Sequence, residues 1–251
     1  MCNYDVVGNV VPRVPYFRPP PLVCEHLAGF VVSGNGHLAL TGLEIVSART
    51  AFVVQHGARL TVDSATVSDS RGGFAATGRT KMVIRSSIVR RNAGWQPSVV
   101  DASGDCEVHI THCVFSDNTA SDEGILRVVG GGSLSMHSVQ LLDNEVRSLA
   151  LTGGIPRSYT AVSCSLLSKV QRRGMMWFDA STASMSGLVF ARNSAVDGAA
   201  FMYSRSSTVV VQDTEVAGTT LPTSKCVQVW LAAWYPQQLT LAHRCTRQDS
   251  C

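Results

Sequence analysis

Residues 106–145 read CEVHITHCVFSDNTASDEGILRVVGGGSLSMHSVQLLDNE, and this stretch contains two near-copies of one unit. The first copy runs from Val108 to Asn118, and the second runs from Leu134 to Asn144, 26 residues later. In both copies two apolar residues alternate with polar ones, a short break follows, and a third apolar residue precedes the Asn. Self-similarity at a fixed period of this length indicates a solenoid or another repeat architecture.

Related units recur along most of the chain at intervals of 22 to 30 residues. Counted from the first apolar residue of a unit, positions 0, 2 and 7 are apolar, position 4 is small or polar, and position 10 is turn-like. Alternation with period 2 predicts short strands that bury one face. The starting residues of the nine units are Leu38, Leu60, Met82, Val108, Leu134, Tyr159, Ala183, Val209 and Leu239.

A second apolar run follows the turn of each unit, as at 51–54, 74–76 and 125–128. One repeat therefore consists of three short strands separated by turns, which is too short for a propeller blade of roughly 40 residues. The pattern predicts an all-β fold, a single-stranded right-handed parallel β-helix of about nine to ten coils. The right hand follows from the twist preference of strands and from the usual hand of parallel connections.

The two ends of the chain differ from the repeat. Residues 1–28 are Pro-rich, and we expect them to form an N-terminal extension or cap. Residues 29–251 are expected to form the β-helix, with an atypical last coil at about 226–251. Solenoids need capping elements at both ends. Because no convincing C-terminal cap is visible, a segment of a longer rod is an open alternative.

Composition restricts the function classes. Charged residues make up 16% of the chain and the net charge is +3, with acids and bases interleaved and no Lys/Arg run typical of nucleic-acid binding. No window reaches the roughly 18 uncharged apolar residues of a membrane span. None of the eight cysteines forms a C-x-x-C pair, and we find no cofactor motif. We therefore expect no nucleic-acid partner, no membrane span in this chain, no metal and no cofactor.

Short motifs within the units resemble those of a known repeat family. The segments 113–118 (CVFSDN) and 190–193 (FARN) resemble the F-x-x-N motif of polymorphic outer-membrane-protein repeats, and 72–74 (GGF) and 198–201 (GAAF) resemble the partner G-G-A-x motif. Large protozoan surface proteins of the dispersed gene family type carry similar repeats. The resemblance implies a right-handed β-helix in a surface-exposed, adhesive or antigenic protein, and hence an extracellular or cell-surface location.

Position 9 of the units contains the strongest chemical candidates. Residues at one position of successive coils stack roughly 4.8 Å apart, so Asp117 and Asp143 are expected to be neighbouring carboxylates flanked by Arg91. Paired carboxylates suit acid–base catalysis on sugars, and pectin-lyase-like polysaccharide lyases and hydrolases use acids along such a face. A solvated column of turn residues is the competing interpretation, and the motifs of a polygalacturonase site are missing.

The remaining candidate columns are interpreted as structural. Stacked Asn side chains can hydrogen-bond from coil to coil, and Asn tolerates the left-handed backbone conformation at a turn. His112 and His137 lie on adjacent units but lack a third metal ligand, Cys113 is expected in the core, and Trp177 is expected to be buried. The Asn column comprises Asn92, Asn118, Asn144 and Asn193.

The sequence therefore favours a non-enzymatic surface or extracellular interaction module built on a β-helix. Its expected partners are a polysaccharide or a host or cell-surface protein. A carbohydrate-active enzyme that uses the acidic column is one alternative, and a purely structural segment of a larger repeat protein is another.

Overall fold

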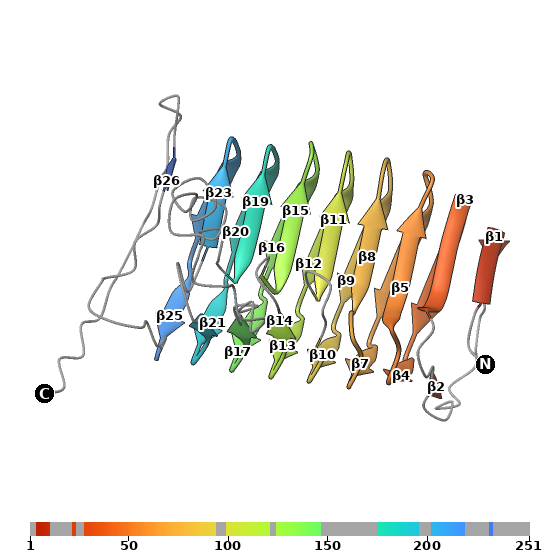
Figure 1. Ribbon diagram of the computed structural model, residues 1–251, viewed down its shortest axis with the longest axis horizontal. Helices are drawn as coiled ribbons and strands as arrows, with labels where there is room; N and C mark the ends of the chain where they lie inside the picture. The colour runs from red at the N-terminus through yellow and green to blue at the C-terminus, as the bar shows by residue number, and fades with distance from the viewer. Residues whose placement is uncertain are drawn as a thin grey trace, which may run out of the picture.

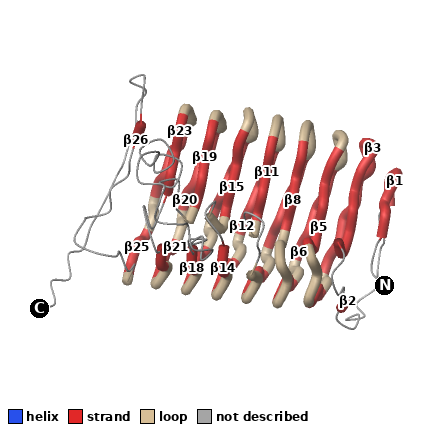
Figure 2. The backbone as a smooth tube through the Cα atoms, viewed as in Figure 1, coloured by secondary structure: helices blue, strands red, loops and turns tan. Residues whose placement is uncertain are grey.

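The computed structural model describes residues 4–10, 22–23, 28–93, 99–120, 124–146, 175–195, 202–218 and 231–232. These residues contain strands and turns but no helix, and every strand pair is parallel. The strands stand side by side along a rod (Figure 1), and the turns between them line up at its edges (Figure 2). The protein is a parallel β-helix, as the repeat predicts.

Each coil contributes one strand to each of three faces. Face A begins at β3, a long strand that passes from face C to face A through a turn with positive φ at Gly34 and Asn35. The strands of face A are β3 (Ala28–Thr41), β6 (Arg59–Asp63), β9 (Lys81–Arg85), β12 (Glu107–Thr111), β16 (Ser133–His137), β20 (Thr182–Ser186) and β24 (Thr208–Gln212).

Face B is a separate sheet of eight short strands, and a small sheet of three two-residue strands follows it. Face B comprises β2 (Leu22–Val23), β4 (Glu44–Val46), β7 (Thr66–Ser68), β10 (Ile88–Arg90), β13 (Val114–Ser116), β17 (Gln140–Leu142), β21 (Val189–Ala191) and β25 (Glu215–Ala217). The small sheet comprises β14 (Thr119–Ala120), β18 (Glu145–Val146) and β22 (Ser194–Ala195).

Face C contains the second apolar run of each unit. Its strands are β5 (Thr50–Gln55), β8 (Phe74–Thr77), β11 (Val100–Ser103), β15 (Leu126–Val129), β19 (Met176–Asp179), β23 (Met202–Arg205) and β26 (Leu231–Ala232). Within residues 1–28, β1 (Tyr4–Val10) pairs with β3 and β2 pairs with β4, so both continue the sheets toward the N-terminus.

The described residues contain fewer coils than the nine to ten that the sequence predicts for the whole chain. Seven starting residues pair in series through the registers of face A, from Leu38 to Val209, which leaves about six turns instead of nine to ten. Leu134 pairs directly with Ala183, so the prediction of a coil that starts at Tyr159 between them was wrong. Residues 147–174 and the expected unit at Leu239 lie outside the described residues.

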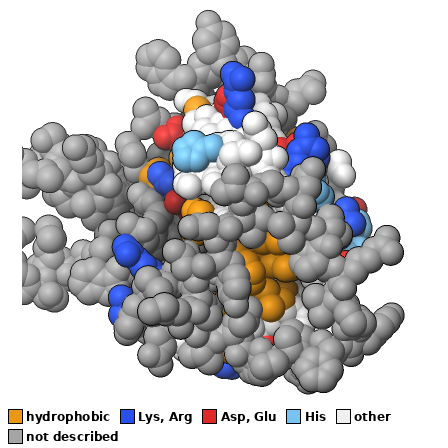
Figure 3. Space-filling model, turned by 90° about the vertical axis from the view of Figure 1, so that its right-hand side faces the viewer, with side chains coloured by type: hydrophobic (Ala, Val, Ile, Leu, Met, Phe, Trp, Pro, Cys, Tyr) orange, Lys and Arg blue, Asp and Glu red, His pale blue; other side chains and the backbone are white. Residues whose placement is uncertain are grey.

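The core consists of the inward-facing residues of the three faces, which stack on their equivalents in the next coil. The rings of Phe30, Phe52 and Phe74 stack with centroid distances of 5.5 and 5.0 Å. Seen along the rod from the β1 end, a patch of hydrophobic side chains is visible near the middle, and most Lys, Arg, Asp, Glu and His side chains lie above it or to its sides (Figure 3). Period-2 alternation thus separates a dry core from a polar surface.

Two columns of turns have left-handed backbone. Position 4 has positive φ in all seven described units, and position 9 does too, from Ser47 (φ 59°) to Gly218 (φ 58°). The sequence had placed this conformation at position 10, where Asn is frequent. It falls one residue earlier because the left-handed residue turns the chain so that the position 10 side chain points inward.

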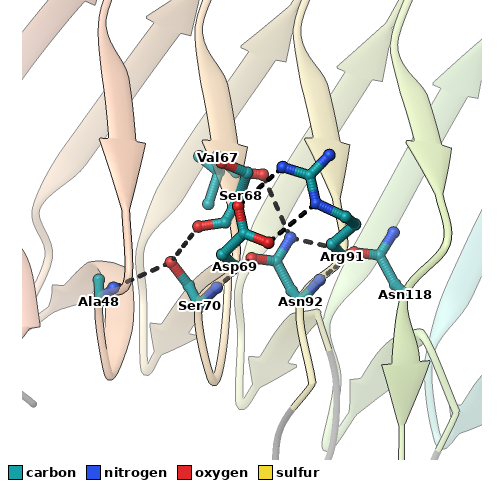
Figure 4. A network of polar contacts seen from close by, with 8 residues as sticks. All are labelled: Ala48, Val67, Ser68, Asp69, Ser70, Arg91, Asn92 and Asn118. Carbon is teal, nitrogen blue, oxygen red and sulfur yellow. Dashed lines mark hydrogen bonds and ion pairs between the residues drawn. The ribbon is translucent and has the colours of Figure 1, made fainter. Parts of the chain in front are cut away.

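The inward side chain at position 10 is buried. Asn92, Asn118, Asn144 and Asn193 are at most 1% exposed. The Oδ1 of Asn118 accepts hydrogen bonds from the backbone N–H and the Nδ2 of Asn92, each at 3.0 Å, and its own Nδ2 donates to the Val89 carbonyl at 2.9 Å. Figure 4 shows the start of this ladder, where the Ser70 N–H donates to Asn92.

The same pattern continues to the far end of the ladder. Asn118 donates to the Oδ1 of Asn144, and Asn144 donates to the Oδ1 of Asn193 at 3.0 Å. Each amide therefore satisfies backbone groups of the preceding coil that would otherwise be buried without partners. We call this chain of contacts the Asn ladder.

Asn118→Ala should lower the free energy of unfolding by about 3 kcal/mol, because it leaves several buried donors and acceptors unsatisfied. Gln140→Ala, at an exposed outward position on β17, is the control and should change stability by less than about 0.5 kcal/mol. Chemical denaturation measures both. Equal costs for the two variants would contradict a structural role for the Asn ladder.

Gly42→Ala should cost about 1 kcal/mol, although an added Cβ would meet no heavy atom within 4 Å. The cost comes from the backbone, because Gly42 has φ 68° in the position 4 column. Gly42→Asn should cost clearly less, because Asn tolerates this region. Thermal unfolding that ranks the Asn variant below the Ala variant would show that the backbone conformation is not the cause.

Candidate functional site

The position 9 column runs along the corner between face B and the small sheet. In coil order it contains Ser47, Asp69, Arg91, Asp117, Asp143, Arg192 and Gly218. The backbone N–H of each of these residues except the last donates to the preceding position of the next coil, as Asp117 does to Leu142 at 3.1 Å. Asp117 and Asp143 thus lie on adjacent coils, with Arg91 on the other side of Asp117. Ser168, which the repeat had included, lies outside the described residues.

Two of the three acids in this column are held by arginines. The Nε and Nη2 of Arg91 donate to the two carboxylate oxygens of Asp69, each at 2.8 Å (Figure 4). Arg192 makes the same two-point contact with Asp143, at 2.7 and 2.6 Å. The side-chain hydrogen bonds from Arg91 and Arg192 lower the pKa values of Asp69 and Asp143. Such pairs are geometrically specific but exposed, and they add little stability.

Asp117 differs from the other two acids. No ion pair involves it within the described part of the chain, and it lies between the two arginine-bound acids. The pKa of Arg91 is raised mainly by its hydrogen bond to Asp69 and that of Arg192 mainly by its hydrogen bond to Asp143, and the charge of Asp117 adds a smaller contribution to both. General acid catalysis by a carboxyl group requires a raised pKa, whereas the pKa of its neighbour Asp143 is lowered. The two arginine-bound acids, Asp69 and Asp143, are therefore held in the charged form.

The outward side chains of face A form a second set of polar groups. Glu107 on β12 accepts a hydrogen bond from Lys81 at 2.8 Å and contacts the Nε2 of His109 at 2.6 Å. These contacts, with Lys81 as the larger cause, lower the pKa of Glu107. On β16 and β20 most outward residues are short hydroxyl side chains, such as Ser133, Ser135 and Ser184.

A shallow depression lies where the tall charged side chains give way to short ones. Its volume is about 290 Å³, which is enough for a small polar group but not for a deep pocket. Short outward side chains expose the sheet surface between taller neighbours. The lining residues include Glu107, His109, Ser135, Ser184 and Thr208.

The cysteine and tryptophan side chains in the described part of the chain are buried and contribute to the core. Cys113 and Cys106 are buried free thiols whose pKa is raised by burial, which makes them poor nucleophiles. Trp177 is 6% exposed, and the Arg127 guanidinium lies 5.2 Å from its ring centroid. Burial of Trp177 leaves little of its surface for a sugar ring.

The histidine pair is brought together without becoming a metal centre. The rings of His112 and His137 meet edge to face at a centroid distance of 5.8 Å, and the Nδ1 of His137 lies 2.9 Å from the hydroxyl of Ser186. Within the described ranges no group of three or more His, Cys, Asp or Glu side chains could hold a metal ion. The described residues also include no helix long and apolar enough to cross a membrane.

Comparisons of the chain with protein-family models, with curated proteins and with solved structures found no match. The class of the protein, a parallel β-helix, is therefore assigned from its own repeat and register.

Arg192→Gln should raise the pKa of Asp143 toward its ordinary value of 3.8. A carboxyl whose pKa is lowered in the folded state contributes stability above its unfolded pKa and loses that contribution as the pH falls through the folded pKa. The variant should therefore be less stable than the wild type near pH 6, and the difference should vanish in strong acid.

Carbon-13 NMR titration of the Asp143 carboxyl measures this shift. Arg85→Gln removes an exposed arginine on β9 and should leave the titration unchanged. An unchanged titration midpoint in Arg192→Gln would show that the two-point contact does not persist in solution.

Proposed function

We propose that this chain is a non-enzymatic interaction module of a surface or extracellular protein, with a polysaccharide or a cell-surface protein as its partner. One observation carries the proposal. Face A displays its outward side chains in unbroken register over seven strands, so that each row is an ordered line of groups on a rigid support. Binding residues presented on a rigid scaffold lose little entropy when a partner is bound.

The chemistry of the corner column supports the same proposal. An enzyme of the glycosidase or lyase type would need a carboxyl that releases a proton near neutral pH. Arg91 and Arg192 instead hold Asp69 and Asp143 in the charged form, which favours structural ion pairs over proton transfer. The likeness of 113–118 and 190–193 to polymorphic outer-membrane-protein repeats adds a further argument for a surface-exposed, adhesive module.

The carbohydrate-active enzyme is the second candidate, and Asp117 is the observation in its favour. This exposed acid has no ion pair within the described residues and stands one coil from Asp143. A substrate that bridges the two coils would meet both carboxylates.

Affinity electrophoresis through native polysaccharides, with a reducing-end assay on the same samples, separates the candidates. We expect retardation by at least one polysaccharide and no new reducing ends. The double variant Asp117→Asn/Asp143→Asn should retain the wild-type retardation, because neither acid is needed for a scaffold. Reducing ends that appear with the wild type and fall by a factor of about 100 or more in the double variant would establish the enzyme instead.

If the protein is neither retarded by a polysaccharide nor produces reducing ends, the result favours a protein partner or a purely structural segment. Pull-down on intact cells then distinguishes those two. Neither Asp117 nor Asp143 lines the depression on face A. The double variant therefore leaves that depression unchanged, and it serves as a reference surface.

A further inference from the structure

The fold gathers arginines that are scattered in the sequence. Arg49 and Arg71 occupy equivalent positions of adjacent coils, because the N–H of Arg71 donates to the Ala48 carbonyl at 2.8 Å. Arg90 and Arg91 belong to the next coil along, just before the same turn. We call these four residues the arginine corner.

The arginine corner has an excess of positive charge. Asp69 lies within these three coils and is bound by Arg91. No ion pair within the described part of the chain involves Arg49, Arg71 or Arg90, and Arg49 and Arg71 are exposed. Four arginines, counted with Asp69 and with Asp117, whose charge acts on Arg91, give a local charge of 4 − 2 = +2. Asp117, on the following coil, borders the corner on one side.

The arginines also have unused hydrogen-bond donors. A guanidinium has five N–H donors in a planar fork that fits sulfate, phosphate and carboxylate oxygens. Arg91 uses only its Nε and Nη2 on Asp69, and Arg49 and Arg71 are exposed to solvent. The corner therefore combines charge with donors for anionic oxygens.

The geometry of the corner favours a linear polyanion. Arg49, Arg71 and Arg91 stand on three successive coils, and coils repeat every roughly 4.8 Å along the rod. A chain that lies parallel to the rod would present successive anionic groups to successive arginines. The backbone under them is fixed by coil-to-coil hydrogen bonds, such as Ala93 to Ser70 at 2.8 Å, so little order is lost on binding.

The described residues around the corner, which do not include 94–98, favour a polysaccharide over a nucleic acid. Proteins that bind single-stranded nucleic acids use exposed aromatic side chains on which bases stack. The exposed large hydrophobic residues of the described chain are Ile88 and Val210, neither of which is aromatic. We propose that the arginine corner binds a sulfated polysaccharide. This inference rests on the proposed function and names the surface and partner class of the module.

The test compares a variant of the corner with a control outside both the corner and face A. Arg49→Ser/Arg71→Ser removes half of the corner, and Arg79→Ser removes one exposed arginine from the turn between β8 and β9. Dextran sulfate is the probe, neutral dextran controls for the sugar backbone, and a single-stranded oligonucleotide is the competing polyanion. Affinity is measured between 50 and 200 mM salt, and circular dichroism checks that both variants fold.

We expect wild-type protein to bind dextran sulfate and not neutral dextran. The corner variant should lose about tenfold or more in affinity at 50 mM salt, and the slope of log affinity against log salt should fall by about 1.4 to 1.8, or roughly 0.7 to 0.9 per arginine. Arg79→Ser should keep its affinity within about twofold. A loss per arginine in Arg79→Ser equal to that in the corner variant would overturn the assignment of the site, because it would indicate unspecific attraction.

Preference for the oligonucleotide over dextran sulfate at equal charge would overturn the choice of partner. Absence of binding to dextran sulfate would overturn the proposal altogether. Neither result produces reducing ends or depends on Asp117, so failure here is distinguishable from failure of the non-enzymatic proposal.

Discussion

The structure depends on one constraint: each coil must satisfy the buried backbone groups of its neighbour at the corner where the chain turns. Parallel strands satisfy their own groups within the faces, but the corner after position 9 brings backbone into the interior. The Asn ladder meets this need because one amide both donates and accepts. Asn118 bonds to Asn92, to Asn144 and to the Val89 carbonyl at once. The left-handed residue before each Asn is what turns its side chain inward.

The periodicity of the sequence predicted most of the fold, because each strand of a solenoid repeats the same local pattern. The second apolar runs coincide with β5, β8, β15 and β19. The count of coils failed for a physical reason. A local alternating pattern predicts a strand but not its partner, and only the pairing of strands decides which coils are successive. The direct register between Leu134 and Ala183 is a long-range property that no local pattern contains.

The candidate site was less predictable than the fold. Stacking of Asp117 and Asp143 follows from a constant repeat, but the partner of each acid depends on which residue occupies the next coil. Arg192 reaches Asp143 from 49 residues away, because β17 pairs directly with β21. Runs of Lys and Arg in the sequence do not predict the arginine corner, because a run contains only residues that are neighbours in the sequence. On a β-helix the relevant neighbours are one coil apart, 22 or 26 residues here.

The contact between Asn144 and Asn193 is the one on which the proposed order of the coils depends most directly. NMR of the side-chain amides measures this contact, through the nuclear Overhauser effects of the Asn144 Nδ2 protons and their rate of exchange with deuterium. The Asn ladder predicts that the Asn144 Nδ2 protons contact Asn193 and, on the preceding coil, Phe115. Their exchange with deuterium should be as slow as that of the core backbone amides. Contacts to any residue of 147–174 in place of Asn193, or exchange as fast as at exposed turns, would contradict this prediction.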